Sequence, residues 1–132
     1  MAAILIYKGK VLAFKRPPHS TKSFISSKYE FPGGKIKDKE SEIFALKREL
    51  KEELEINIES FIKYFESKYH YPDFEVNIKF YLARIENLRF KLKAHTEYKL
   101  LEIQNLKTLD WLQADYKVIR KLELYGFSDY LI

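Results

Sequence analysis

The chain has 132 residues and no cysteine, which excludes disulfides, thiolate metal sites and cysteine nucleophiles. Hydrophobic residues make up 46% of it, including ten Tyr and ten Phe, a composition typical of a globular protein with an aromatic core. At this length we expect residues 1–132 to form a single domain. Lys8 and Lys10 interrupt the apolar amino terminus, which is too short for a signal peptide or membrane span, so we expect a cytoplasmic protein.

The chain carries 24 Lys and Arg against 19 Asp and Glu, a net charge of +5 that favours an anionic partner. The Lys residues are scattered, and no basic helix or aromatic platform for nucleic acid stands out. We therefore expect a small nucleotide as the partner, no nucleic acid and no membrane. The sequence is compatible with either a monomer or a homodimer.

The amino-terminal third of the sequence predicts short strands joined by loops. Apolar runs at residues 2–7 and 11–16 flank "KGK" and predict a hairpin with Gly9 in its turn. Residues 17–28 are polar, contain two prolines and predict a loop. A short strand at residues 29–31 should follow, because proline and then two glycines end it.

A helix is predicted from Ser41, a suitable N-cap, through residue 54. Its apolar residues recur at helical spacing: Ile43, Leu46, Leu50 and Leu54. Glu52 and Glu53 lie three and four positions beyond Glu49, so all three carboxylates project from one face. Like-charged pairs at this spacing destabilise a helix by roughly 0.2–0.5 kcal/mol each, so another group should neutralise them.

The carboxyl-terminal half alternates well enough to predict two long strands, at residues 61–71 and 74–85, with a turn at "YPD". Shorter strands are expected around residues 88–92 and 98–102. A last helix is predicted at residues 115–124 with Asp115 as its N-cap. Strands interleaved with two helices predict an α/β fold, with helices packed on a mixed β-sheet.

The three carboxylates beside Gly33 and Gly34 indicate a site for Mg²⁺, a hard cation that takes oxygen ligands at about 2.0–2.1 Å. Without side chains, the two glycines can bring a backbone carbonyl to the metal and let a phosphate chain approach. A metal that bridges carboxylates and a diphosphate would lower the pKa of a bound water. These residues therefore predict hydrolysis of a phosphoanhydride.

The spacing Gly34, five residues, Glu40, seven residues, "RELKEE" resembles the Nudix box of Nudix hydrolases. The segments "VLAFKRP", "YEFPGGK" and "LDWLQAD" resemble regions outside the box in the MutT-like branch, so the likeness covers most of the chain. It implies an α/β/α sandwich and a hydrolase that uses Mg²⁺, with Mn²⁺ as a substitute. The implied substrate is a nucleoside triphosphate, often oxidised or noncanonical, cleaved to a monophosphate and pyrophosphate.

Carried over residue by residue, the resemblance implies that Glu49, Glu52 and Glu53 bind the metal together with the Gly33 carbonyl. Glu49 or one of its partners would orient the attacking water. Arg48 would pair with the box carboxylates.

The resemblance also assigns supporting and substrate-binding residues. Gly34 and Glu40 would fix the loop. Lys35 and Arg16 would face the phosphates, although Arg16 is equally expected as an ordinary surface residue. Phe31 would lie near the base pocket.

Asp115 matches the position from which the MutT-like branch reads a base edge. Capping the helix and reading a base are equally expected of this residue, and the two roles can coexist.

Two positions depart from the family pattern. Glu55 stands where the box normally ends with glycine, so Asn57 is expected to end the helix instead. Ala94 precedes His95 where relatives usually carry a glutamate that serves as a further ligand or base, and Glu97 is the alternative carboxylate.

The three histidines, His19, His70 and His95, lack the spacing of metal ligands, so surface or half-buried roles are expected for them. The box glutamates have a simpler alternative reading as a solvated helix face, which explains neither the glycine pair nor the spacing to Glu40. Two alternatives to the leading function stay open. One is a Nudix hydrolase acting on a dinucleotide, nucleotide sugar or capped RNA, and the other is a nucleotide-binding module without turnover.

Overall fold

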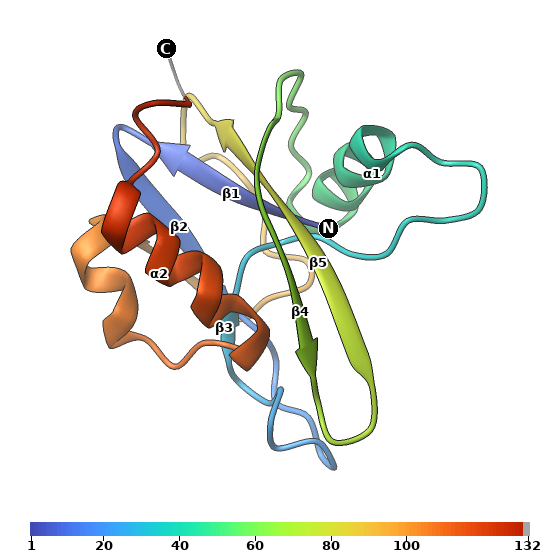
Figure 1. Ribbon diagram of the computed structural model, residues 1–132. Helices are drawn as coiled ribbons and strands as arrows, with labels where there is room; N and C mark the ends of the chain where they lie inside the picture. The colour runs from blue at the N-terminus through green and yellow to red at the C-terminus, as the bar shows by residue number, and fades with distance from the viewer. Residues whose placement is uncertain (131–132) are drawn as a thin grey trace.

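The computed structural model describes residues 1–130, in which a six-stranded mixed sheet carries helices on both faces (Figure 1). The elements in chain order are β1 (Ala2–Tyr7), β2 (Lys10–Lys15), β3 (Tyr29–Glu30), α1 (Glu42–Leu54), β4 (Ile62–His70), β5 (Glu75–Arg84), β6 (Glu97–Leu101) and α2 (Tyr116–Tyr125). Two short 3₁₀ helices, Ile103–Thr108 and Gln113–Asp115, precede α2. Most predicted elements therefore exist, with their ends shifted by a residue or two.

The strand order is β3-β2-β1-β5-β4, and β6 pairs with β2. β1 and β5 run parallel, and the other pairs are antiparallel. The predicted β1–β2 hairpin turns at Lys8 and Gly9, with φ values of 50° and 77°. Positive φ at both central residues suits the right-handed twist of the strands.

Both faces of the central strands are buried, because successive side chains point to opposite sides of the sheet. On one face the sheet packs against α2 through the following residues: Ala2, Ile4, Ile6, Phe80, Leu82, Val118, Ile119 and Leu122. On the other face it packs against α1 through another set: Ala3, Leu5, Leu12, Tyr81, Leu46, Leu50 and Leu54. The predicted α/β/α sandwich with a mixed sheet is confirmed.

The prediction of a strand at residues 88–92 is wrong. This stretch is an extended loop whose backbone crosses the end of α1: the Lys91 amide donates to the Leu54 carbonyl and the Lys93 amide to the Glu53 carbonyl, both at 3.0 Å. Its alternating apolar side chains pack into the core on the α1 face. The last carbonyls of a helix lack hydrogen-bond donors within the helix, and here the amides of the loop are the donors.

The two ends of α1 show one correct and one incorrect prediction. Ser41 caps the start, because its hydroxyl accepts a hydrogen bond of 3.1 Å from the Phe44 amide. At the other end Glu55 itself adopts the left-handed conformation (φ 56°, ψ 39°), and its amide donates to the Lys51 carbonyl. The expectation that Asn57 ends the helix is therefore wrong. Lys91 and Lys93 contact the Glu55 carboxylate at 3.2 and 3.1 Å and hold it there.

Within residues 1–130, no helix combines the length and the apolar character needed to cross a membrane.

Candidate functional site

The glycine pair is fastened to the start of β1. The Ala3 amide donates to the Pro32 carbonyl at 2.8 Å, and the Gly34 amide donates to the Met1 carbonyl at 3.0 Å. A β-carbon at Gly33 would lie 2.1 Å from the Met1 carbonyl oxygen and 2.7 Å from the Ala2 α-carbon. Only glycine fits this crossing, which brings the turn next to α1.

Arg48 neutralises the carboxylates that face the turn. Its guanidinium donates two hydrogen bonds to Glu40, at 2.6 and 2.9 Å, and one to Glu49 at 3.0 Å. It also contacts Glu52 at 3.3 Å and donates to the Lys35 carbonyl at 3.1 Å. The bond from Arg48 lowers the pKa of Glu40 to about 2. The repulsion expected among the helix glutamates is thus relieved from within the helix.

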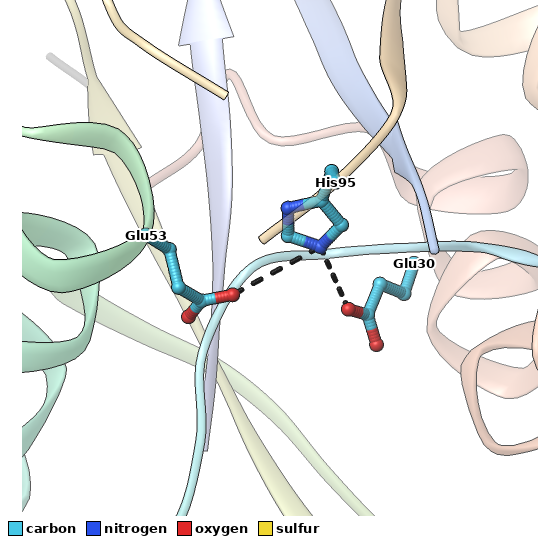
Figure 2. A group of neighbouring side chains, drawn as sticks. All are labelled: Glu30, Glu53 and His95. Atoms are coloured by element: carbon cyan, nitrogen blue, oxygen red, sulfur yellow. Dashed lines mark hydrogen bonds and ion pairs between the residues drawn. The ribbon is translucent and has the colours of Figure 1, made fainter. Parts of the chain in front are cut away.

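Glu53 belongs to a second group of side chains, with Glu30 and His95 (Figure 2). Its Oε2 accepts a 3.1 Å hydrogen bond from the Gly33 amide, and its Oε1 lies 3.9 Å from Nε2 of His95. The same Nε2 lies 2.8 Å from Oε2 of Glu30, and Arg16 pairs with Oε1 of Glu30 at 3.0 Å. The three box glutamates therefore divide, with Glu49 and Glu52 on Arg48 and Glu53 beside His95.

Burial shapes the electrostatics of this second group. Burial, with smaller contributions from Glu30 and Glu49, raises the pKa of Glu53 to about 8. Donor atoms of Glu30, Glu53 and His95 all lie within 4.8 Å of one another. Carboxylate oxygens that lack full compensation attract a divalent cation. The donor set therefore fits a metal ion.

Sequence reasoning missed two members of this group, Glu30 and His95. Strand alternation was the available signal for Glu30, because Tyr29 and Phe31 face the α2 side and their neighbour must face α1. The expectation of a surface or half-buried role for His95 is wrong, since its side chain is only 1% exposed. The available signal was the family pattern, which places a ligand or base at the preceding position, Ala94, whereas the spacing of the histidines gives none because the partners of His95 lie on other elements.

Asp115 occupies the N-cap position of α2, as predicted, but it is buried and its side chain makes no capping bond to the helix. The Phe31 amide hydrogen-bonds to its carboxylate instead. Burial, followed by the charge of Glu30, raises the pKa of Asp115 well above its usual range. Among residues 1–130, Oδ2 of Asp115 finds no hydrogen-bond partner.

Aromatic side chains gather close to Asp115. The Ala114 amide donates to the Tyr71 hydroxyl at 3.1 Å, and the Tyr71 ring stacks on Phe24 with centroids 5.4 Å apart. Phe74 packs on Tyr71 at 5.0 Å. The loop 17–28 thereby meets the tip of the β4–β5 hairpin at one end of the molecule (Figure 1).

The remaining predicted residues lie in varied surroundings. The ring of Phe31 packs in the core with its centroid 4.8 Å from that of Trp111, and its backbone hydrogen-bonds to Asp115. Lys35 is exposed. Glu97 accepts a short hydrogen bond from the Tyr29 hydroxyl, and it lies outside the metal-ligating group found among the described residues.

Comparison with known sequences identifies relatives over most of the chain. The family model for the NUDIX domain matches residues 1–122. An "8-oxo-dGTP diphosphatase" of Buchnera aphidicola subsp. Acyrthosiphon pisum is 36% identical over 98 residues, covering 72% of this chain and 77% of the relative. A second, from Buchnera aphidicola subsp. Schizaphis graminum, is 30% identical over 120 residues, covering 91% of this chain and 88% of the relative.

Solved structures share the fold at low sequence identity. The E. coli ORF135 protein superposes with a TM-score of 0.81 at 21% identity, covering 99% of this chain and 91% of that one. The MutT protein of Methanosarcina mazei Go1 gives 0.82 at 18% identity, covering 93% and 90%. These likenesses extend the fold assignment to nearly the whole chain.

Proposed function

Because the chain belongs to the Nudix family as a MutT-like hydrolase of phosphoanhydride bonds, we propose that it cleaves nucleoside triphosphates to monophosphates and pyrophosphate. The substrates are canonical or oxidised nucleotides, and the names of the two Buchnera relatives support an oxidised guanine nucleotide among them. The observation that carries the proposal is the contact of the glycine turn with α1, where Gly33 bonds to Glu53 and Gly34 lies against Glu49, together with the buried carboxylate of Asp115.

We propose Mg²⁺ as the cofactor, with Mn²⁺ able to replace it, held by Glu49, Glu52, Glu53 and the Gly33 carbonyl. When bound, it supplies charge stabilisation at the phosphate oxygens and a more acidic water. The chain prepares this site in two ways. The Gly33 amide orients Glu53. Arg48 holds Glu49 and Glu52 by hydrogen bonds of 3.0 and 3.3 Å.

The reaction adds water to phosphorus and breaks the bridging bond between the α- and β-phosphates, so that pyrophosphate leaves. Glu49 or a neighbouring box glutamate orients the water and accepts its proton. Arg16 and Lys35 bind the phosphate oxygens. Arg16 already carries a carboxylate partner in Glu30, which fixes its guanidinium beside the site.

The base is recognised at Asp115. Its buried Oδ2, unpartnered among the described residues, requires a polar partner, which the edge of a nucleobase supplies. The neighbouring Tyr71 and Phe24 rings offer apolar surface for the base.

Pyrophosphate release from a panel of canonical and oxidised nucleotides, with Mg²⁺ or Mn²⁺, tests this function. We expect turnover of at least one of them, and no turnover of any would exclude it. Product analysis with a dinucleotide, a nucleotide sugar and capped RNA separates the other Nudix substrates. Nucleotide binding by calorimetry with metal present, but without hydrolysis of any substrate, would indicate a binding module.

A further inference from the structure

We propose that His95 is a positioning residue for the substrate phosphates. Its hydrogen bond with Glu30 fixes the carboxylate that in turn holds the guanidinium of Arg16. This inference rests on the proposed function, because that function assigns Arg16 to the phosphate oxygens. The three side chains act in sequence, and only Arg16 touches the substrate.

The three side chains meet across neighbouring strands. Glu30 lies on β3, Arg16 directly follows β2, and His95 stands two residues before β6. Phe14 and Lys15 of β2 pair with both β3 and β6, so these two strands lie on opposite sides of β2. The bond between Glu30 and His95 therefore passes over β2 and joins segments from both of its sides (Figure 2).

Glu30 has a partner on each carboxylate oxygen. Its Oε1 accepts a hydrogen bond of 3.0 Å from Nη1 of Arg16, and its Oε2 lies 2.8 Å from Nε2 of His95. Nδ1 of His95 is buried and finds no hydrogen-bond partner within residues 1–130. Because a buried N–H without an acceptor is costly, the ring hydrogen belongs on Nε2, and His95 donates to Glu30. With both oxygens engaged, the carboxylate holds Arg16 in one direction.

The direction of His95 itself is set by packing and by the neighbouring backbone. Its side chain is 1% exposed, and its ring lies 5.4 Å from that of Phe14. The Thr96 amide donates to the Lys15 carbonyl at 2.9 Å, so the backbone next to His95 is tied to the backbone next to Arg16. The imidazole is therefore a rigid donor to which Glu30 is attached.

Glu53 explains why Glu30 needs this donor. The negative charge of Glu30 contributes to the raised pKa of Glu53, which shows that the two carboxylates repel each other. Nε2 of His95 lies near both, 2.8 Å from Glu30 and 3.9 Å from Glu53. Without this N–H, Glu30 would turn away from Glu53 and release Arg16 from its position.

Arg16 benefits from such support because its side chain is 34% exposed. A long side chain loses rotamer freedom when it binds a ligand, and a partner that fixes the guanidinium beforehand reduces this loss. The bond to Glu30 uses one terminal nitrogen of a group with five N–H donors. The other donors can therefore bind phosphate oxygens while Glu30 stays in place.

The test compares His95→Gln with His95→Met in the full chain. The two side chains are similar in length and volume, but only glutamine can donate a hydrogen bond to Glu30. Calorimetry with Mg²⁺ measures binding of the α,β-methylene analogue of dGTP, which cannot be cleaved at the proposed bond. We expect His95→Met to weaken binding about tenfold and His95→Gln to keep most of the affinity.

Turnover of cleavable nucleotides provides a second readout for His95→Met. The loss should appear in KM far more than in kcat, because Arg16 binds the phosphates before the reaction as well as in the transition state. It should also be equal for every base, since the phosphates are common to all nucleotides. A role of His95 in packing alone predicts no difference between His95→Met and His95→Gln in either readout.

A double-mutant cycle shows whether His95 acts through Arg16. Arg16→Met should itself weaken binding of the analogue, and adding His95→Met to it should cost no further affinity. Glu30→Gln loosens Arg16 at a position where the side chain is 15% exposed, so the test does not depend on how well His95→Met folds. It should weaken binding in the wild type and have no effect in the Arg16→Met background.

Equal affinities of His95→Gln and His95→Met overturn the inference, and so does a loss that persists in the Arg16→Met background. Tighter binding by Glu30→Gln overturns it as well, because Glu30 would then compete with the phosphates for Arg16. Pyrophosphate release separates the two proposals. Release with equal affinities of the two His95 variants removes only this inference, and the expected affinities without release from any nucleotide remove only the proposed function.

Discussion

Gly34 lies against the carboxylate of Glu49 so closely that a β-carbon at Gly34 would stand 2.3 Å from the Glu49 carboxyl carbon. The glycine is therefore required by a side chain and not by its own backbone, since its φ is not positive. Gly33 differs, because the atoms that exclude a side chain there belong to the backbone of Met1 and Ala2. The two glycines should respond differently to the same substitution.

Gly34→Ala should fold and lose activity. The obstructing atoms are the end of a flexible side chain, so Glu49 can rotate away at a cost of about 1 kcal/mol in the free energy of unfolding. Turnover should fall about tenfold or more, because Glu49 leaves the metal site. Gly33→Ala should instead lower the melting temperature severely. Thermal unfolding and pyrophosphate release measure both effects, and full turnover in Gly34→Ala would contradict the placement of Glu49.

Arg48→Lys should lower both the melting temperature and the turnover. One guanidinium serves Glu40, Glu49, Glu52 and the Lys35 carbonyl, and an ammonium cannot match that planar set of donors. Lys47→Ala is the matched control, because Lys47 makes a surface contact with Glu59 at 3.3 Å. The melting temperature and the turnover of both variants test this prediction. Equal effects of the two substitutions would show that the hydrogen bonds of Arg48 contribute no more than a surface ion pair.

Glu52→Gln and Glu53→Gln should reduce turnover by orders of magnitude for every nucleotide, because the charge that Mg²⁺ needs is removed. Both variants should fold, since glutamine keeps the size and can still accept a hydrogen bond. Asp115→Asn should keep the chemistry and change the preferred base, because it alters the donors and acceptors offered to the base edge. Ratios of activity across several nucleotides reveal the difference. A uniform loss in Asp115→Asn would remove Asp115 from the base pocket.

Asp115→Asn should also change how stability depends on pH. Burial raises the pKa of Asp115, so the folded protein favours the neutral acid, while the unfolded chain ionises near pH 4. Stability from this group is therefore complete below about pH 4 and is lost as pH rises through the folded-state pKa. Asparagine stays neutral throughout. The melting temperature of Asp115→Asn, relative to wild type, should rise between acid and neutral pH, and a difference that is constant with pH would refute this account.

Glu55→Gly should raise the melting temperature relative to the wild type, and this difference should grow with salt concentration. The left-handed backbone at Glu55 costs a non-glycine residue roughly 1–2 kcal/mol, which glycine avoids. The substitution also removes the contacts with Lys91 and Lys93, which salt screens in the wild type. Glu55→Gln keeps the backbone and loses only the ion pairs, so it is the control. The melting temperatures of the wild type and both variants are measured at low and high salt. A wild type that responds to salt in the same way as the two variants would contradict this account.

Patterns within single segments gave correct predictions where local geometry decides the outcome. The spacing of Leu46, Leu50 and Leu54 correctly predicted α1, because residues one turn apart lie on the same face of a helix and this face packs on the sheet. The glycine pair and the box spacing located the turn beside that helix. Alternation predicted the long strands, and a sheet buried on both sides by two helices follows from them.

Tertiary structure alone decided how the glutamates divide and which residues join them. Glu30 and His95 are 65 residues apart, so no periodicity relates them. The segment around residues 88–92 alternates like a strand but bonds to the end of α1, whose last carbonyls lack partners within the helix. Asp115 precedes a helix as a cap would, yet its side chain turns to the Phe31 amide. Local sequence fixes which conformations a segment favours, whereas partners for buried polar groups depend on segments that only folding brings together.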